Sequence, residues 1–474
     1  MPVDPQLQQI DLAVIAVAAT AEFWATSSAT VRSALLEGLA QALEAHQIEL
    51  VALADEETRL GAGRLSGEVA RTAFQLRGFA TEVRNGVPYA SVDDPAIAGA
   101  PPAGRPRLIR VNEPLGPVAM FSASNFPFAF SVLGGDTASA LAAGCPVVVK
   151  SHSGHPRLSQ AVFDIAQGVL KAQGLPAGLL GLVSGASRAA GTYLVQHPHI
   201  AAVAFTGSFG GGTALWRAAN ERPVPVPFFG ELGSINPLIA LPDILARDGQ
   251  ALASILAGSI TMGCGQFCTS PGVIVLLPGE ASDRFVDHLA TALQPLATHA
   301  MLTPAMRQGF DHGVAQLEQA AQARPLFQAA ADTRGPAPRL FEVDAQAFID
   351  NAHLREEVFG PCAVVVRAAS VAQVNQVLSA IDGTLTATLW GFEQADESAR
   401  SIYRSARKVA GRVLFGGVPT GVAVTAAQQH GGPWPASTQP QTTSVGYAAL
   451  QRFLRPVALQ DAPAWTLENP GTCA

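Results

Sequence analysis

Charged residues are scarce in this sequence: Lys, Arg, Asp and Glu make up 14% of its 474 residues. Acidic residues outnumber basic ones by 37 to 30, the formal net charge is −7, and the basic residues form no tract. A mildly acidic chain without a basic cluster binds nucleic acid and anionic membranes poorly. We therefore expect neither among the partners of this protein.

Cysteine is also rare, and the number of cysteines is odd. A disulfide framework is typical of small secreted domains with paired cysteines, so that class of protein is excluded. The apolar stretch Ile10–Ala21 has no basic flank, because the first basic residue is Arg32, so it is not a signal peptide but a candidate buried helix. We expect free thiols and a cytoplasmic location. The five cysteines are Cys145, Cys264, Cys268, Cys362 and Cys473.

Apolar residues are abundant, at 48% of the chain, which is enough for two or three domains with large cores. Their spacing predicts helices over 11–54 and 67–83. A Pro- and Gly-rich stretch at 94–106 predicts a linker or arm. Short apolar runs then alternate with helical ones, which predicts parallel α/β sheets covered on both faces. The expected strands are 118–121, 147–149, 179–183 and 201–205, the expected helices are 134–143 and 158–171, and a second such series covers 235–415.

The segment GCGQFCTSPG, residues 263–272, contains a candidate nucleophile. Cys268 lies there in a loop-like setting between glycines and Pro271. A nucleophilic cysteine needs access and an environment that favours its thiolate. On this segment alone, a buried inert cysteine is the commoner case. The spacing of Cys264 and Cys268 does not suit a zinc pair, so we expect no metal site.

Two further segments contain candidate polar groups. FGELGSINP, residues 229–237, places Glu231 in an apolar run, where desolvation raises a carboxyl pKa toward that of a general base. FSASNFP, residues 121–127, places Asn125 just past a strand, where its amide can donate to an oxyanion. Taken singly, Glu231 equally fits a surface turn, and Asn125 is more typical of a turn residue.

A glycine-rich turn follows the strand expected at 201–205 and opens a helix. The N–H groups at such a helix start can bind a pyrophosphate, although the run matches neither G-x-G-x-x-G nor a P-loop. It also fits an ordinary tight turn. Lys150 ends the VVV strand, where parallel sheets have their ligand crevice. The turn consists of Phe205, Thr206, Gly207, Ser208 and the residues through Gly212.

The order of these features resembles the ordered signatures of the aldehyde dehydrogenase superfamily. The likeness spans about 111–456 and includes EEVFGP at 356–361. It is greatest for the subgroup of NADP-dependent long-chain (fatty) aldehyde dehydrogenases and 2-oxoglutarate semialdehyde (2,5-dioxopentanoate) dehydrogenases. The segments that carry this are 122–156, HGGPWPAST at 430–438 and TTSVGYAALQRFLRP at 442–456. Two features depart from the family pattern: this sequence begins late, and Gln441 replaces a frequent Arg.

The resemblance implies NAD(P)-dependent oxidation of an aldehyde to a carboxylic acid. The favoured substrate is 2-oxoglutarate semialdehyde, and the alternative is a medium- or long-chain aliphatic aldehyde. In the family mechanism Cys268 attacks the aldehyde, and the Asn125 amide and the Cys268 N–H hold the oxyanion. Hydride loss leaves a thioester, and Glu231 activates the water that hydrolyses it.

The resemblance also implies cofactor contacts. Glu357 is expected to hold the nicotinamide ribose, with Phe359 beside the ring. NAD-preferring relatives have a glutamate where this chain has Ser153. The missing charge, with Lys150 and Arg188 as partners for a 2′-phosphate, predicts NADP as the cofactor, with NAD as the second choice.

His430 has two interpretations at this point, an auxiliary proton carrier near the thiol or the cap of a Gly-Gly turn. The implied fold is α/β with two Rossmann-related parallel-sheet domains and a small oligomerisation arm. Phe453 and Leu454, with the arm, are expected to form a subunit-bridging sheet in a homodimer or homotetramer. The expected parts are a cofactor domain at 1–93 and 112–230, a catalytic domain at 231–437, and the arm and C-terminal segment at 94–111 and 438–474.

Two other classes stay open from the sequence. A cofactor-independent cysteine hydrolase would use Cys268 and His430, but it would leave the glycine-rich turn and Glu357 without a role. A binding or structural protein would leave the set of Asn125, Glu231 and Cys268 unexplained. A fluorescence change on addition of NADP separates the dehydrogenase from both.

Overall fold

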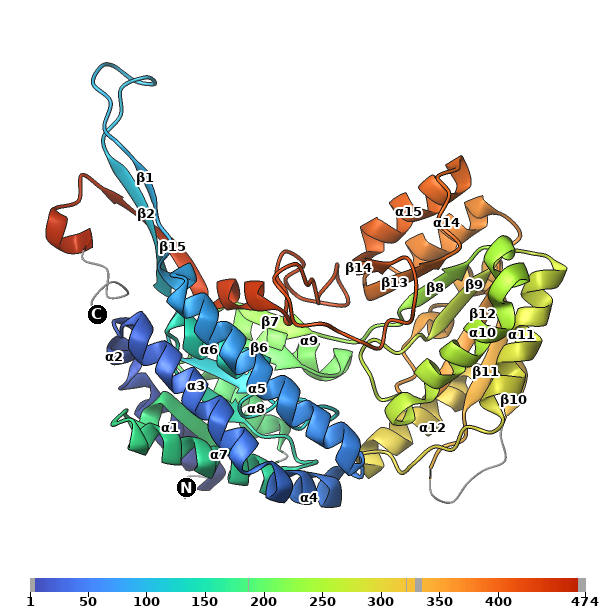
Figure 1. Cartoon of the computed structure of the whole chain (residues 1–474), viewed down its shortest axis with the longest axis horizontal. Helices are drawn as coiled ribbons and strands as arrows, with labels where there is room; N and C mark the ends of the chain where they lie inside the picture. The colour runs from blue at the N-terminus through green and yellow to red at the C-terminus, as the bar shows by residue number, and fades with distance from the viewer. Residues whose placement is uncertain (1–4, 186, 321, 329–334, 468–474) are drawn as a thin grey trace.

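The computed structural model of the chain describes residues 5–185, 187–320, 322–328 and 335–467. Two layered α/β halves and a small antiparallel sheet make up the molecule (Figure 1). The expected α/β class with two parallel-sheet halves is confirmed. Cys473 lies outside the described residues, and the other four cysteines are free thiols.

The first half contains a five-stranded parallel sheet in the spatial order β5-β4-β3-β6-β7. The strands predicted in this region are all present, and β7 adds one that was not predicted. Their bounds are β3 (Val118–Phe121), β4 (Val147–Lys150), β5 (Leu180–Val183), β6 (Ala202–Thr206) and β7 (Phe228–Glu231).

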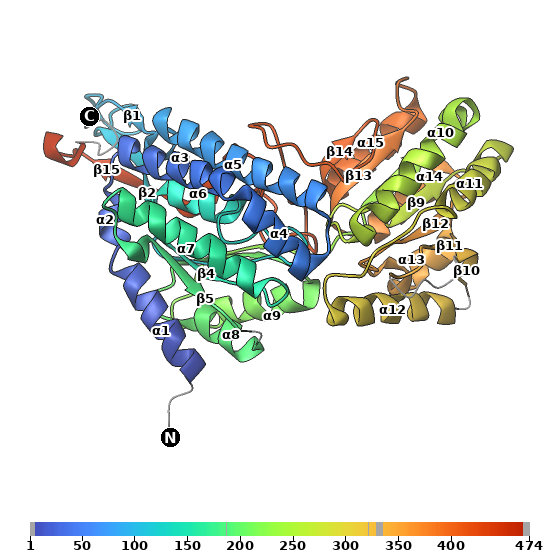
Figure 2. The same ribbon diagram turned by 60° about the horizontal axis from the view of Figure 1, so that its bottom comes forward.

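Helices cover both faces of this sheet (Figure 2). Alternate residues of β3 belong to different cores: Val118 and Met120 pack with α3, α5, α6 and α7, whereas Ala119 and Phe121 pack with α1, α8 and α9. Such alternation is expected of a strand buried on both faces. The helices are α1 (Pro5–Ala18), α2 (Ala21–Ala25), α3 (Ala29–Ala45), α4 (Gln47–Thr58), α5 (Ala62–Arg84), α6 (Gly135–Ala143), α7 (Pro156–Ala172), α8 (Arg188–Gln196) and α9 (Phe209–Asn220).

The helical stretch predicted over 11–54 is thus divided into separate helices. Ser28 begins α3, and its side chain accepts a hydrogen bond from the Val31 N–H, as an N-cap residue does. The apolar stretch near the N-terminus is the buried helix that was predicted, with Ile10, Val14 and Val17 in its core face.

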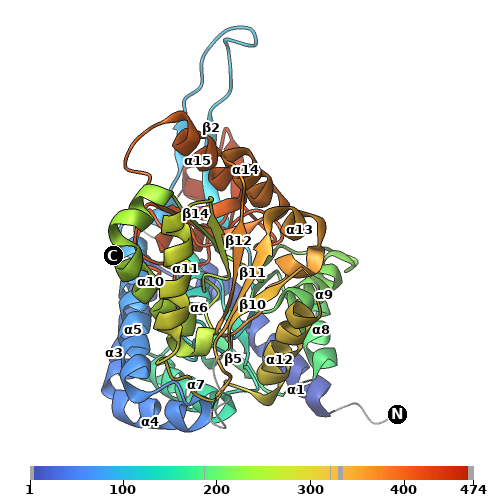
Figure 3. The same cartoon turned by 90° about the vertical axis from the view of Figure 1, so that its right-hand side faces the viewer.

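The second half contains a seven-stranded sheet in the order β10-β11-β12-β9-β8-β13-β14, in which β10 alone is antiparallel to its neighbour (Figure 3). Helices α10 and α11 cover one face, and α12 to α15 pack on the other. The strands are β8 (Pro237–Ala240), β9 (Val273–Leu276), β10 (Arg324–Gln328), β11 (Arg339–Asp344), β12 (Cys362–Arg367), β13 (Thr384–Trp390) and β14 (Ala410–Leu414). The helices are α10 (Pro242–Thr261), α11 (Glu280–Leu293), α12 (Pro304–Gln319), α13 (Ala345–Asp350), α14 (Val371–Ala380) and α15 (Glu397–Val409).

The third sheet, β1-β2-β15, is antiparallel and projects from the first half (Figure 1). Its strands are β1 (Val92–Asp94), β2 (Leu108–Pro114) and β15 (Leu454–Gln460). Phe453 was expected to take part in bridging subunits, but it is fully buried in the core of its own first half. None of the helices in the described residues is long and apolar enough to cross a membrane.

Candidate active site

The carboxyl ends of the first sheet bring several predicted residues into one row. Lys150 on β4 is the register partner of Phe121 on β3, and Thr206 on β6 is the register partner of Glu231 on β7. Parallel strands present their last residues at the same edge, which is where α/β folds bind ligands. Residues far apart in the sequence therefore reach one crevice because their strands share a direction.

The segment that contains Cys268 follows α10 through a single turn, Met262–Gly265. Gly263, Cys264 and Gly265 all have a left-handed backbone, with φ of 54°, 62° and 66°. A Cβ on Gly265 would lie 2.2 Å from the carbonyl carbon of Gly360, so only glycine allows this close approach. Gly265 thus allows the Cys268 loop to pack directly against the EEVFGP loop.

Asn236, which precedes the loop in the chain, holds the backbone of the loop at and after Cys268. Its side-chain amide donates to the carbonyl oxygens of Cys268, at 2.8 Å, and of Ser270, at 2.9 Å. Asn236 is fully buried and has a φ of 46°. It belongs to the same ELGSINP segment as Glu231, but sequence reasoning did not single it out, because nothing in the sequence shows which backbone an amide will hold.

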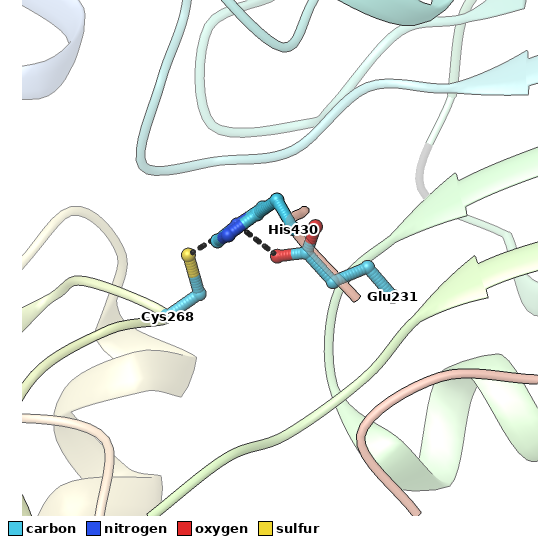
Figure 4. Close-up of side chains that lie close together, drawn as sticks. All are labelled: Glu231, Cys268 and His430. Atoms are coloured by element: carbon cyan, nitrogen blue, oxygen red, sulfur yellow. Dashed lines mark hydrogen bonds and ion pairs between the residues drawn. The ribbon is translucent and has the colours of Figure 1, made fainter. Parts of the chain in front are cut away.

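Three side chains from distant parts of the chain meet at the site (Figure 4). The Nε2 of His430 lies 3.5 Å from the Sγ of Cys268 and 3.2 Å from the Oε1 of Glu231. Ser444, which sequence reasoning missed, donates to the Oε2 of Glu231 at 2.5 Å. His430 and Glu231 are buried, whereas Cys268 is half-buried. His430 thus lies beside the thiol, and its role as an auxiliary proton carrier remains a prediction.

The electrostatics of Glu231 differ from the sequence expectation. Burial acts to raise the pKa of Glu231, but the electrostatic interaction with His430 and hydrogen bonds with His430, Ser444 and Cys268 outweigh it, so the pKa lies below its usual value. The predicted elevation is therefore wrong, because it took account of desolvation and not of the partners. A carboxylate that stays ionised is ready to accept a proton from the thiol or from water.

The thiol of Cys268 has the opposite shift. Enclosure by protein, followed by the charge of Glu231 and a hydrogen bond to it, raises the pKa of Cys268 well above its ordinary value. The surroundings of Cys268 therefore do not favour a thiolate in this state, contrary to the sequence expectation. The thiol needs a base at hand, and both His430 and Glu231 are within reach.

Asn125 lies beside the nucleophile loop. Its side-chain amide donates to the carbonyl oxygen of Gln266, two residues before Cys268, at 3.0 Å. Its own carbonyl oxygen accepts a bond from Arg64 at 2.5 Å, and the residue is buried. This position connects the first half to the Cys268 loop. The oxyanion role of the amide remains a prediction.

The glycine-rich turn joins β6 to α9 as predicted and has features that suit a bound cofactor. The Oγ1 of Thr206 is buried and has no hydrogen-bond partner among the described residues. A Cβ on Gly207 would lie 2.8 Å from the Phe205 ring, and a Cβ on Gly212 would lie 2.1 Å from Leu232. Ser208 caps α9 by accepting from the Gly211 N–H. An unpaired hydroxyl beside an exposed helix start is a fitting place for a phosphate or ribose.

The other predicted cofactor contacts lie at the same edge of the sheet. Lys150 is buried, and its Nζ donates to the carbonyl oxygens of Ser151, at 3.0 Å, and of Gly185. Desolvation lowers its pKa. Ser153 is exposed in the loop after β4, and Arg188 is exposed at the first position of α8. Both side chains are free to reach a ligand in solvent at this edge.

Glu357 and Phe359 lie on the facing loop of the second half. They line a small cavity of about 30 Å³ together with Ser234, Phe267 and Gly265. The surrounding protein, followed by the charge of Glu231, raises the pKa of Glu357 to about 8, although its side chain remains open to solvent along the crevice. Glu357 and Phe359 thus share a cavity with Gly265 and Phe267 of the Cys268 loop.

Glu231, Cys268 and His430 are also a group of potential metal ligands, the single such group in the described part of the chain. Their ligand atoms lie within 4.8 Å of one another. The chemistry of a nucleophile beside two bases accounts for the cluster without a metal. The absence of a resident metal remains a prediction.

The chain is similar to known proteins over most of its length. The model of the "Aldehyde dehydrogenase family" matches residues 4–432. Alpha-ketoglutaric semialdehyde dehydrogenase 2 of Azospirillum brasilense is 43% identical over 91% of this chain and 83% of its own. The alpha-ketoglutaric semialdehyde dehydrogenase of Acinetobacter baylyi is 39% identical over 91% of this chain and 82% of its own.

Solved structures share the fold. A variant of proline utilization A from Bradyrhizobium japonicum matches with a TM-score of 0.81 and 27% identity. The match covers 96% of this chain, which spans 45% of the length of that longer protein.

Proposed function

The chain belongs to the aldehyde dehydrogenase family, and on that premise we propose that it oxidises 2-oxoglutarate semialdehyde (2,5-dioxopentanoate) to 2-oxoglutarate. The printed activity of the two relatives above supports this choice of substrate. The observation that carries the chemistry is the contact of Cys268 with His430, and of His430 with Glu231. The alternative substrates remain medium- and long-chain aliphatic aldehydes.

In the first step the Cys268 thiol loses its proton to His430 or Glu231 and its sulfur bonds to the aldehyde carbon. The carbonyl oxygen becomes an oxyanion, which we assign to the amide of Asn125 and the N–H of Cys268. A bound NAD(P), which the glycine-rich turn, Lys150 and Glu357 would hold, would supply the hydride acceptor that this oxidation needs. The product attached to Cys268 is then a thioester.

Glu231 acts in the second step. Its carboxylate, ionised at neutral pH because of its lowered pKa, accepts a proton from water while the water oxygen attacks the thioester carbon. The C–S bond breaks, and the sulfur of Cys268 recovers a proton from His430 or Glu231. A base beside the thioester favours a free acid as product over transfer to coenzyme A.

We propose that the glycine-rich turn, Lys150 and Glu357 hold the cofactor. The unpaired Thr206 hydroxyl supports this fit. We further propose a preference for NADP, because Ser153 brings no negative charge to the edge where Lys150 and Arg188 lie. A cytoplasmic location is proposed from the four free thiols among the described residues.

The cofactor preference is tested with Arg188→Ala and Ser153→Glu. Charge-assisted contacts contribute roughly 1.5–3 kcal/mol each, so Arg188→Ala should raise the KM for NADP about tenfold or more and leave the KM for NAD unchanged. Ser153→Glu should shift the preference toward NAD by repelling a 2′-phosphate. Equal effects of Arg188→Ala on both cofactors would make the arginine structural.

The dehydrogenase activity is tested with Cys268→Ala and its matched control Cys264→Ala. NADPH formation from 2,5-dioxopentanoate should be lost in the first variant and retained in the second, because Cys264 is buried and its thiol contacts the carbonyl of His299 instead. Full activity of Cys268→Ala would contradict the mechanism.

A cysteine hydrolase remains the alternative of another class, because the contact of Cys268 with His430 also suits ester hydrolysis. That alternative predicts turnover of esters without NAD(P) and no oxidation of aldehydes. Parallel assays with and without the cofactor distinguish the two activities.

A further inference from the structure

A second cavity lies between helix α5 and the loop that precedes Cys268. Its volume is about 440 Å³. Arg64, Glu68 and Arg71 line it from α5, where spacings of four and three residues place them on one face of the helix. Phe126, Met262 and Phe267 line it from the loops. None of these three charged residues has a role in the chemistry described above.

The cavity adjoins the reactive groups. Phe126 follows Asn125 in the chain, and Phe267 precedes Cys268, so both wall residues are direct neighbours of residues assigned to the reaction. Arg71 also interacts electrostatically with the Cys268 thiol. A molecule in this cavity is therefore close enough to present one end to Cys268.

Hydrogen bonds to backbone carbonyls hold the two guanidinium groups in place. Arg64 donates to the carbonyl of Asn125 at 2.5 Å, and its guanidinium carbon lies 5.1 Å from the centroid of the Phe126 ring and 4.7 Å from that of Phe267. Arg71 donates to the carbonyl of Val422 at 2.9 Å. Fixed guanidinium groups lose little further freedom when they bind a ligand.

Both arginines retain unused donors. The Nη1 of Arg64 and the Nε of Arg71 are buried and have no hydrogen-bond partner among the described residues. A buried charged donor without an acceptor costs folding free energy. A ligand with acceptor atoms would remove this cost at both arginines.

The charges in the cavity sum to a positive value. Glu68 lies 3.5 Å from Arg64 and accepts from the Phe128 N–H at 3.2 Å. Burial, opposed by the charge of Arg64, raises the pKa of Glu68 to about 7. Near neutral pH this carboxyl therefore cancels at most one of the two arginine charges. His299, which also lines the cavity, adds no negative charge.

We propose that Arg64 and Arg71 form a carboxylate-binding subsite that holds the anionic end of the substrate while the aldehyde end reaches Cys268. The inference rests on the proposed function and adds to it the residues that select an aldehyde with a carboxylate. Hydrogen bonds from guanidinium groups to carboxylates are charge-assisted and therefore strong, and the Phe126 and Phe267 rings line the cavity beside these donors. A neutral aliphatic aldehyde leaves the same donors unpaired and is bound less well.

The first test measures binding without turnover. 2-Oxoglutarate, the product of the proposed reaction, is titrated calorimetrically into wild type, Arg64→Met, Arg71→Met and the control Arg77→Met. Arg77 lies on the same helix but pairs with Glu44 and Glu37 outside the cavity. Each cavity variant should bind about tenfold more weakly or worse, Arg71→Lys should retain part of the affinity, and Arg77→Met should bind as wild type. Unchanged affinity in both folded cavity variants overturns the inference.

The second test compares two aldehydes of equal length, 5-oxopentanoate and pentanal. Wild type should have the higher kcat/KM for 5-oxopentanoate, and the ratio of the two values should fall at least tenfold in Arg71→Met. A wild-type enzyme without this preference, or a variant with an unchanged ratio, contradicts the subsite. Loss of all aldehyde oxidation in wild type, with arginine-dependent binding of 2-oxoglutarate intact, contradicts the proposed function and leaves the subsite standing.

Discussion

The Nε2 of His430 lies between two partners, the Sγ of Cys268 and the Oε1 of Glu231. One nitrogen carries at most one proton, and one N–H points to one acceptor. The Nδ1 of the same ring is buried without a hydrogen-bond partner among the described residues, so it does not fix the tautomer. A proton on Nε2 therefore bonds to the Sγ of Cys268 or to the Oε1 of Glu231, but not to both at once.

The dependence of the thiol on Glu231 leads to a prediction for Glu231→Gln. Removal of the negative charge takes away a cause of the raised pKa of Cys268, so the thiolate becomes easier to form. Alkylation of Cys268 by iodoacetamide should reach half of its maximal rate at a lower pH than in wild type. The same variant lacks the base for hydrolysis, so it should release a burst of about one NADPH per site and then turn over slowly.

The control for this prediction is Glu280→Gln, because that carboxylate is 85% exposed on α11. It should leave both the alkylation profile and the steady-state rate unchanged. A Glu231→Gln variant that loses burst and steady-state rate in proportion would show that Glu231 acts mainly on the thiol.

At the scale of elements, the turn from β6 into α9 decides how closely the helix approaches the sheet. Gly210 and Gly212 are neighbours in the first turn of α9 but have different surroundings. A Cβ on Gly212 would lie 2.1 Å from Leu232 and 2.9 Å from the Phe205 ring, whereas a Cβ on Gly210 would have nothing within 4 Å. Gly212 is therefore required for packing, and Gly210 is not.

Gly212→Ala should destabilise the fold by about 1–3 kcal/mol through overpacking. It should also weaken NADP binding, since the helix start moves away from β6. The matched Gly210→Ala should leave stability unchanged or raise it by up to about 1 kcal/mol through helix propensity. Urea denaturation and cofactor titration measure both effects. Equal stability of the two variants would contradict this prediction, because it would mean that α9 can move away from Leu232 without loss of folding free energy.

At the scale of the whole molecule, the β1-β2-β15 sheet projects away from both halves (Figure 1). The sheet and the loop between β1 and β2 expose apolar side chains: Val92 is 49% and Leu108 is 36% exposed on the strands, and Ile97 is 48% exposed in the loop. Open strand edges with apolar side chains are typical of surfaces that another chain covers. We therefore propose that the sheet joins subunits in a homodimer or homotetramer.

The oligomeric state is tested by light scattering at micromolar concentration. Wild type should be a dimer or tetramer, and a variant with Val92→Lys and Ile97→Lys should be smaller. Ile48→Lys is the control, because Ile48 is 90% exposed on α4, away from the sheet. A monomeric wild type would contradict the proposal, and so would an unchanged assembly of the double variant.

The sequence by itself determined the strands from β3 to β6, the helices α6 and α7 between them and the family, but it did not predict α8. Apolar periodicity is a local property, and the order of motifs such as those around Asn125, Glu231 and Cys268 is preserved in the chain. The tight turns of the cofactor-binding segment and of the Cys268 loop could also be predicted from their glycines, because a tight turn restricts the residue type locally.

The tertiary structure alone decided the electrostatics of the site. The sequence places Glu231 in an apolar run and predicts a raised pKa, whereas the fold brings His430 and Ser444 to it from about 200 residues further along the chain and lowers the pKa. Likewise, Arg64 and Arg71 look like surface residues of a helix until α5 packs beside the Cys268 loop. Coulomb and hydrogen-bond energies depend on distances in space, and sequence spacing does not supply those distances.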